Sequence, residues 1–213
     1  MTFYKNYKWL MPMLVFNTAL ILCRVIFTWS LTLAFIPWNV FLGVVPLYFS
    51  YLLPRAGKRS AWLLLGGWLL FFPNAMYIVT DLFHLRERPG VPQWLDLLIL
   101  FSAALNGLIM GFLSLQNVEQ FLRTKIKPAH IHKIAFPIFV LCGYGIYLGR
   151  YLRFNSWDII SHPLSLFSYM GNSIIHPIRN IECWTLTLLF GIWLYLLYRY
   201  FTKLTFKNVQ LQP

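Results

Sequence analysis

Charge is scarce in this sequence, and acidic charge is the scarcest. Of its 213 residues, 11% are charged and only 6 are Asp or Glu, whereas 59% are hydrophobic. Soluble domains usually carry about 25% charged residues, so the chain lacks the polar surface that a water-soluble fold of this size needs. Several apolar runs reach the ~20 residues with which a helix crosses a bilayer. The composition therefore predicts a multi-pass membrane protein.

The short motifs of common enzyme and cofactor classes are also missing. The sequence has no phosphate-binding glycine loop, nucleophile elbow, HExxH zinc motif or haem-attachment motif, so it leaves any cofactor unidentified. The three cysteines, Cys23, Cys142 and Cys183, form no CxxC pair and are typical of reduced, buried thiols. No repeat or soluble domain interrupts the chain, and we expect residues 1–213 to form a single integral membrane domain.

Six apolar segments predict an all-α bundle of six transmembrane spans. They are separated by the basic turn PRAGKRS, the proline- and glycine-rich stretch RERPGVPQ, the basic loop RTKIKPAHIHK and shorter breaks. The first apolar run exceeds the length of a signal-peptide core, and no A-x-A-like cleavage site follows it, so we expect a retained span. The predicted spans are residues 10–33, 39–53, 60–80, 94–121, 134–153 and 183–202.

The distribution of Lys and Arg beside these spans predicts that both termini are cytoplasmic. With the N-terminus inside, the basic residues gather at the inner ends of the spans, as cytoplasmic loops require. The inner residues are Lys5, Lys8, Arg55, Lys58, Arg59, Arg123, Lys125, Lys127, Lys133, Arg199, Lys203 and Lys207, against Arg86, Arg88, Arg150, Arg153 and Arg179 outside. The net charge of +12 is thus a topology signal that also attracts anionic lipid headgroups at the cytoplasmic face. We expect the lipid bilayer as a partner and no nucleic acid.

The stretch FFPNAMYIVTDLFHL, residues 71–85, places polar groups at the outer end of the third span. Ionisable groups inside a membrane are costly unless paired or hydrated, so they normally face the bundle interior. At steps of 3, 4 and 3, the polar residues would share an arc of about 80° on one helix face. Because a proline precedes them, the stretch predicts a kinked helix end with one polar stripe. These residues are Asn74, Tyr77, Asp81 and His84.

Three further spans carry polar or small residues at helical spacing. They are Asn17, Arg24 and Thr28 in the first span, Asp96, Ala103, Asn106, Met110, Ser114 and Asn117 in the fourth, and Gly143, Tyr147, Arg150 and Phe154 in the fifth. Membrane helices pack closely through such faces, so we expect the faces to turn toward one another. Arg24 lies about 15 residues into its span, where a carboxylate partner would lower its cost.

A short apolar and aromatic segment separates the fifth and sixth spans. It begins with NSWD, which resembles a helix N-cap, with Asn155 as the cap and Asp158 three residues later. Trp157 and Tyr169 are amphipathic residues that favour a membrane interface. We therefore predict a helical segment that lies in the outer interface or is partly re-entrant, and that could cover the polar cluster.

Three blocks of this sequence resemble a known family. PNAMYIVTDLFHL, WLDLLILFSAALNGLIMGFLSLQNVE and GYGIYLGRYLRFNSWDII are similar to the family called domain of unknown function 1361, and the blocks extend through most of the chain. The resemblance implies a multi-pass protein of the bacterial cytoplasmic membrane. It implies no activity, substrate or catalytic residue.

Asp81, His84 and Asp96 are the candidate catalytic residues. Asp81 and His84 form an i,i+3 carboxylate–imidazole pair that could act as a general base with its orienting partner. The same pair could bind zinc or another transition metal, but two protein ligands are too few to define a site, and we predict no metal. The structural alternative is that Asp81 forms an ion pair with Arg24, Arg150 or Arg153 while His84 lies at the headgroup level.

The candidate substrate-binding residues surround this pair. Arg150 and Arg153 lie three positions apart, and two guanidinium groups at a membrane surface could hold a phosphate headgroup. The alternative is that they pair with nearby acids and extend to the interface. The full set is Asn74, Tyr77, Arg150, Arg153, Asn155, Asp158 and Arg24.

Three functions are compatible with these features. The first is an enzyme that acts on an envelope or lipid-linked anionic substrate at the outer leaflet. The second is a small-solute transporter that uses the polar stripes as a path, although no inverted repeat supports it. The third is a non-catalytic assembly or scaffold subunit in which the polar cluster fixes helix packing.

Overall fold

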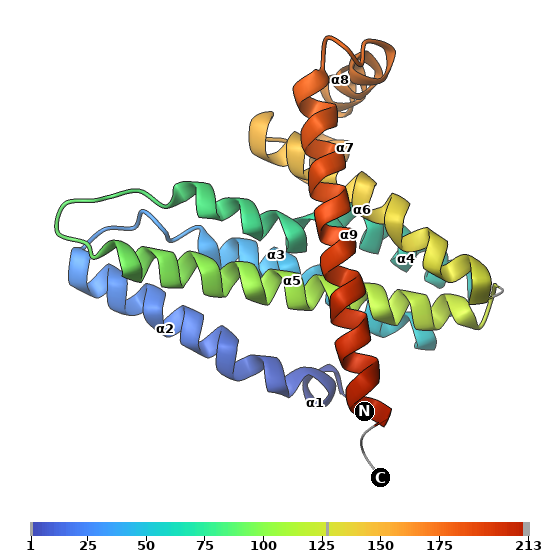
Figure 1. Cartoon of the computed structure of the whole chain (residues 1–213), viewed down its shortest axis with the longest axis horizontal. Helices are drawn as coiled ribbons and strands as arrows, with labels where there is room; N and C mark the ends of the chain where they lie inside the picture. Colours follow the sequence, from blue (N-terminus) through green and yellow to red (C-terminus); the bar gives the residue numbers. More distant parts are fainter. Residues whose placement is uncertain (1, 127, 211–213) are drawn as a thin grey trace. The chain divides into compact units, whose positions relative to one another are not determined.

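The computed structural model of the protein describes residues 2–126 and 128–210, and in these residues it is helical, without a β-strand (Figure 1). The all-α prediction is therefore confirmed. In chain order the elements are α1 (Phe3–Tyr7), η1 (Lys8–Leu10), α2 (Met11–Thr28), α3 (Ile36–Leu52), η2 (Leu53–Arg55), α4 (Lys58–Tyr77), η3 (Ile78–His84), α5 (Gln93–Arg123), α6 (Pro128–Tyr151), α7 (Asp158–Ser161), α8 (Pro163–Ile175) and α9 (Ile181–Gln210), where η marks a 3₁₀-helix.

Six helical segments are long and apolar enough to cross a membrane, which confirms the predicted number of spans. They are Phe3–Thr28, Ile36–Arg55, Lys58–His84, Gln93–Arg123, Lys133–Tyr151 and Ile181–Leu204. The helical segment predicted between the last two spans is present as α7 and α8.

The first predicted span, residues 10–33, is wrong at both ends. Helix begins at Phe3 and α2 ends at Thr28, because Trp29 adopts a left-handed conformation with φ 50° and ψ 28°. Its backbone N–H donates to the Val25 carbonyl and closes the helix. A non-glycine residue in this conformation is uncommon, and apolar composition alone gave no sign of it.

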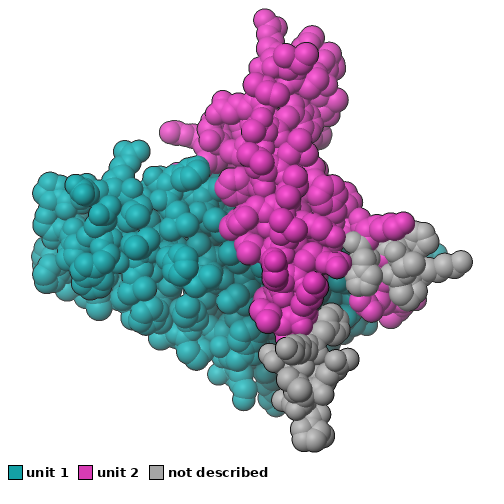
Figure 2. Space-filling model, in the orientation of Figure 1, with its two compact units in different colours: residues 1–121 teal, residues 122–213 magenta. Residues whose placement is uncertain are grey.

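Two compact units make up the chain, residues 1–121 and 122–213, and we describe each separately (Figure 2). The first contains α1 to α4 and nearly all of α5. The second contains α6 to α9.

In the first unit, α5 lies closely against α4 because small residues face each other. A side chain at Gly107 would collide with the carbonyl oxygen of Ala75, and one at Gly111 would collide with the end of Met76. α3 packs along α4. The face predicted for the fourth span is buried at Ala103, Asn106, Met110 and Ser114.

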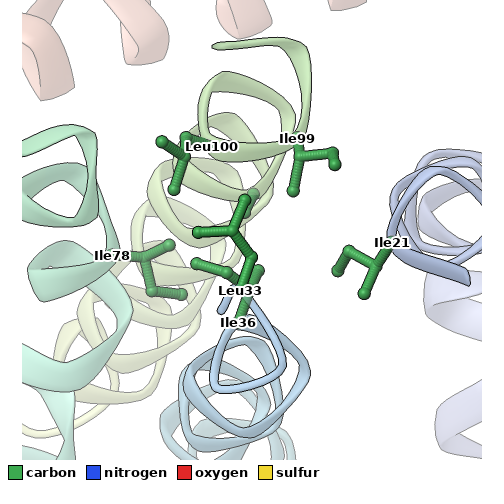
Figure 3. Close-up of a cluster of buried hydrophobic side chains, with 7 residues drawn as sticks. Ile21, Leu33, Ile36, Ile78, Ile99 and Leu100 are labelled. Atoms are coloured by element: carbon green, nitrogen blue, oxygen red, sulfur yellow. The ribbon is translucent and has the colours of Figure 1, made fainter. Parts of the chain in front are cut away.

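An aliphatic core fills one end of the first unit. Figure 3 shows the six labelled side chains of this core converging from different elements. They are Ile21 from α2, Leu33 from the preceding loop of α3, Ile36 from α3, Ile78 from η3, and Ile99 and Leu100 from α5. This core supports the polar residues that lie at the same ends of these helices.

In the second unit, α6 and α9 pack against each other through two glycines. A side chain at Gly143 would collide with the Thr187 carbonyl oxygen, and one at Gly191 would lie 2.9 Å from the Cα of Val140. α8 is attached to both helices. The hydroxyl oxygens of Tyr144 and Ser173 lie 2.8 Å apart, and the indole N–H of Trp184 donates to the Ser173 carbonyl at 2.9 Å.

Candidate functional site

A buried carboxylate, Asp96, holds two guanidinium groups at one end of the first unit. Arg24 donates from Nε to Asp96 Oδ1 at 2.6 Å and from Nη2 to Oδ2 at 3.4 Å. Arg88 donates from Nη1 to Asp96 Oδ2 at 2.5 Å. Arg24 and Asp96 are each only 1% exposed, whereas the side chain of Arg88 is 21% exposed. We call these three residues the Asp96 cluster.

Charge pairing explains why Arg24 and Asp96 tolerate burial. A buried ion is costly unless its partner is close and its remaining donors are satisfied. The third nitrogen of the Arg24 guanidinium, Nη1, donates to the carbonyl of Ser30 at 3.3 Å, in the loop that begins at the left-handed Trp29. The expectation that Arg24 has a carboxylate partner is confirmed, but that partner is Asp96 and not Asp81. The Asp96 cluster carries a formal charge of +1.

Asp81 and His84 belong to the 3₁₀-helix η3, which precedes Arg88 and Asp96 in the sequence. Asp81 is buried and accepts a hydrogen bond from Asn39 Nδ2 of α3 at 2.8 Å. His84 is half-buried, and its ring lies 4.9 Å from that of Phe35, measured between centroids. Arg88 Nη2 donates to the His84 carbonyl at 3.2 Å, which connects η3 to the Asp96 cluster.

The change from α-helix to 3₁₀-helix at Ile78 divides the predicted polar stripe. Residues i and i+3 eclipse in a 3₁₀-helix, so Asp81 and His84 lie on one side of η3. At about 120° per residue instead of 100°, Asp81 is turned roughly 80° further from Tyr77 than an α-helix would place it. Asn74 and Tyr77 are half-buried in the last turn of α4. The single stripe of four residues is therefore wrong, and α4 continues as an α-helix through the proline at position 73.

The remaining candidate residues belong to the second unit. Arg150 is half-buried near the end of α6, and Arg153 is exposed, with a left-handed φ of 61°. Asn155 lies in the turn before α7, and Asp158 is the first residue of α7. The meeting of these residues with Asp81, His84 and Asp96 stays a prediction.

Asp158 organises the start of α7, but not in the predicted way. The expected cap was the side chain of Asn155, whereas α7 begins at Asp158 and its N-cap residue is Trp157, without a side-chain cap bond. Instead the Asp158 carboxylate accepts from the Asn155 backbone N–H at 2.6 Å and from the Ser161 hydroxyl at 2.7 Å. The Asn155 N–H, followed by the Ser161 hydroxyl, holds the pKa of Asp158 below its ordinary value. A carboxylate that reaches back to a backbone N–H is one half of a capping box.

Three partners of the candidate residues were missed in the sequence. Asn39 lay at the predicted start of the second span, and Arg88 and Phe35 lay beside the predicted spans. The signal for Arg88 was available, because it lies only eight residues before Asp96, across a turn rich in proline and glycine. Asn39 had no distinguishing pattern.

A row of neutral polar side chains extends along α5 away from the Asp96 cluster. Asn17 of α2 donates to Ser102 Oγ at 2.6 Å, and the indole N–H of Trp68 donates to Ser114 Oγ at 3.1 Å. Asn117 donates to the hydroxyls of Tyr7 at 2.7 Å and Ser50 at 3.0 Å. These bonds connect α5 to α2, α3 and α4, as interhelical hydrogen bonds do in membrane bundles.

A metal site made of side chains requires several His, Cys, Asp or Glu groups close together. Among the side chains that the structure describes, no group of three or more His, Cys, Asp or Glu is close enough to hold a metal ion. The ionisable groups around Asp96 are instead two guanidinium cations, which repel a metal ion and attract an anion. The chemistry that this end of the unit favours is the binding of an anionic group.

Comparison with known proteins identifies the family of this chain but indicates no activity. No curated protein and no solved structure matches the chain. The model of the family described as "Protein of unknown function (DUF1361)" matches residues 38–197, which include Asp81, Arg88 and Asp96 but not Arg24. This match confirms the resemblance found in the sequence, and the chain belongs to the DUF1361 family.

Proposed function

We propose that this multi-pass membrane protein binds the anionic headgroup of a lipid or lipid-linked envelope substrate, at the extracytoplasmic face of the bacterial cytoplasmic membrane. The observation that supports this is the arrangement of Arg88. Two of its five N–H donors are held, one by Asp96 and one by the His84 carbonyl. In the described part of the chain, its other three donors have no protein partner, and the side chain is partly exposed.

A guanidinium fixed in this way is suited to a phosphate or carboxylate. Such groups accept two parallel hydrogen bonds from one guanidinium, and a fixed fork loses less side-chain entropy on binding than a free one. The Asp96 cluster keeps a formal charge of +1 after its internal pairing, because Arg24 neutralises the carboxylate. Arg88 is therefore the substrate-binding group of the proposal, and Arg24 and Asp96 are positioning residues.

The catalytic part of the proposal rests on Asp81 and His84. They share one side of η3, and the backbone carbonyl of His84 is bonded to Arg88, so an anion held by Arg88 would lie close to this pair. His84 is half-buried, and an imidazole is the side chain that most often serves in general acid–base chemistry. The proposed enzyme would transfer or hydrolyse a group beside the bound headgroup.

A scaffold role is the second candidate, and the closed Arg24–Asp96 pair favours it. A bidentate buried ion pair between α2 and α5 fixes the register of the two helices without any ligand. In this case Arg88 would serve only to satisfy Asp96. The two candidate functions differ in whether the exposed side of Arg88 binds a ligand.

Arg88→Gln tests the proposal against a closely matched control. Arg86→Gln removes an exposed arginine two residues away. Native mass spectrometry would compare binding of phosphatidylglycerol and of a polyprenyl phosphate with that of phosphatidylcholine. We expect Arg88→Gln to weaken binding of the anionic lipids about tenfold or more, since a hydrogen bond to a charged group contributes about 1.5–3 kcal/mol. We expect Arg86→Gln to have little effect.

Cells lacking the protein provide the test of catalysis. An envelope lipid or lipid-linked intermediate should accumulate in these cells, and wild type and Arg86→Gln should return it to its normal level. His84→Gln should retain anionic-lipid binding and fail to restore turnover. If Arg88→Gln and His84→Gln both complement fully and only Asp96 variants fail, the scaffold role is correct and the enzyme proposal is not.

A further inference from the structure

We propose that α8 is a three-sided interfacial helix: one side packs on α6 and α9, the second is embedded in lipid acyl chains, and the third faces water. This assigns a membrane-binding surface to a segment whose side chains play no part in the proposed substrate site. The partner that it fits is the acyl and headgroup boundary of one membrane leaflet.

The first side of α8 is fixed by hydrogen bonds and burial. Ser173 is fully buried, its hydroxyl lies beside that of Tyr144, and its carbonyl accepts from Trp184. Leu166, seven residues earlier, is buried on the same side. The hydroxyl of Tyr169 donates to that of Tyr147 at 3.4 Å. These contacts determine how α8 is rotated about its axis.

The exposed remainder of α8 is divided into an apolar and a polar sector. At 100° per residue, four exposed apolar side chains fall within an arc of roughly 100°. They are Leu164, Phe167, Ile174 and Ile175. The exposed polar side chains Ser165, Ser168 and Asn172 fall within a neighbouring arc of roughly 60°. A helix in water would not gather its exposed apolar residues in one sector.

The attachment points of α8 place it at the level where two spans end. Trp184 lies three residues after the start of α9, and Tyr144 lies seven residues before the end of α6. These separations correspond to about 5 Å and 10 Å of helix. Amphipathic helices bind membranes with their apolar side about 5–10 Å deep, at the boundary of headgroups and acyl chains.

Lipid is a better occupant of the apolar sector than a second protein. Residues 159–178 contain no Asp, Glu, Lys or Arg, whereas protein interfaces are bordered by a polar and charged rim. The span α9 that holds α8 also has exposed apolar side chains, such as Leu189 and Leu196. Trp157, partly exposed just before α7, is the residue type that membrane interfaces favour.

Nitroxide labels on single cysteines of the full-length protein in lipid nanodiscs test this surface. The background carries Cys23→Ser, because Cys142 and Cys183 are buried and Cys23 is exposed. Labels at Phe167→Cys and Ile174→Cys should collide more often with oxygen than with a water-soluble nickel chelate. The matched positions Ser168→Cys and Asn172→Cys, exposed on the same helix, should show the opposite preference.

Each result of this experiment decides the proposal. The proposal is supported if the ratio of oxygen to nickel-chelate collisions alternates with the helical period. The labels in the apolar sector should then lie about 5–10 Å deep in the membrane. If the labels at Phe167→Cys and Ile174→Cys collide with neither reagent, protein covers the sector and the proposal is wrong. If all four labels prefer the nickel chelate, α8 lies in water and the proposal is equally wrong. All four positions are exposed, so the variants should fold, and their unfolding temperatures check this.

Discussion

The charge of Asp96 determines the stability of its end of the first unit. We expect Asp96→Asn to lower the free energy of unfolding by about 3–5 kcal/mol, because it leaves Arg24 buried without a counter-charge. Chemical unfolding in detergent micelles measures this loss. The control is Glu87→Gln, which changes an exposed acid and should cost less than about 0.5 kcal/mol.

The double variant Arg24→Leu/Asp96→Leu separates the charge effect from packing. It removes both buried charges, and replacing a buried ion pair with apolar residues is often neutral. We expect the double variant to be more stable than Asp96→Asn alone. An Asp96→Asn protein as stable as Glu87→Gln would contradict the burial of this pair.

The Asp158 carboxylate makes the start of α7 sensitive to pH. Its pKa in the folded protein is below the ordinary value of about 3.9. A lowered folded-state pKa adds stability that is fully present above the unfolded-state pKa and is lost as the pH falls through the folded-state pKa. We therefore expect the turn from Asn155 to Ser161 to be ordered at neutral pH and to loosen in strong acid.

A carboxyl-carbon NMR titration of Asp158 measures this shift. Ser161→Ala should move the midpoint upward, but only part of the way to the ordinary value, because the Asn155 N–H still donates. A midpoint at or above the ordinary value in the wild type would contradict the contact.

For single residues, the sequence predicted that a buried charge requires a partner, but it did not predict which residue that partner is. That Arg24 requires a carboxylate follows from the cost of a buried charge, and this was correct. Its choice of Asp96 depends on the register between α2 and α5, which one sequence does not contain. Asn39 was missed for the same reason, since its role comes only from the position of η3 beside α3.

At the scale of the helices, close packing of α4 on α5 depends on Gly107. We expect Gly107→Ala to lower the free energy of unfolding by about 1–3 kcal/mol, because its methyl group would collide with the Ala75 carbonyl oxygen and push the helices apart. Gly66→Ala in α4 is the control. No atom lies within 4 Å of a side chain added there, so the better helix propensity of alanine should make it neutral or stabilising. Equal effects of the two variants on unfolding in micelles would contradict the close contact.

The existence of each span could be predicted from the sequence, but the positions of the span ends were harder to predict. Apolar length determines that a helix crosses a membrane, and the fourth span, predicted at 94–121, is found at Gln93–Arg123. The end of the third span was harder, because the change to a 3₁₀-helix at Ile78 follows from packing and not from apolar length. It separated Asp81 and His84 from the residues that we had placed beside them.

For the whole molecule, an even number of spans requires both termini to lie on the same side of the membrane, and the basic residues indicate which side. Twelve Lys and Arg lie at one set of span ends and five at the other, and such residues are retained in the cytoplasm. We therefore expect a C-terminal fusion to green fluorescent protein to fluoresce and a C-terminal fusion to alkaline phosphatase to be inactive. Phosphatase inserted in the loop at residues 89–91 should be active.

The basic turn between α3 and α4 supplies the control for this orientation. Replacing Arg55, Lys58 and Arg59 with Gln removes three exposed charges, and with them the stacking of Arg55 on the Tyr51 ring of α3. We expect these changes to lower fluorescence and raise phosphatase activity of the C-terminal fusions, because the charge difference that sets the orientation becomes smaller. An active phosphatase on the wild-type C-terminus would place His84 and Arg88 at the cytoplasmic face. The anionic headgroup that Arg88 is proposed to bind would then belong to the inner leaflet, and an envelope substrate would be excluded.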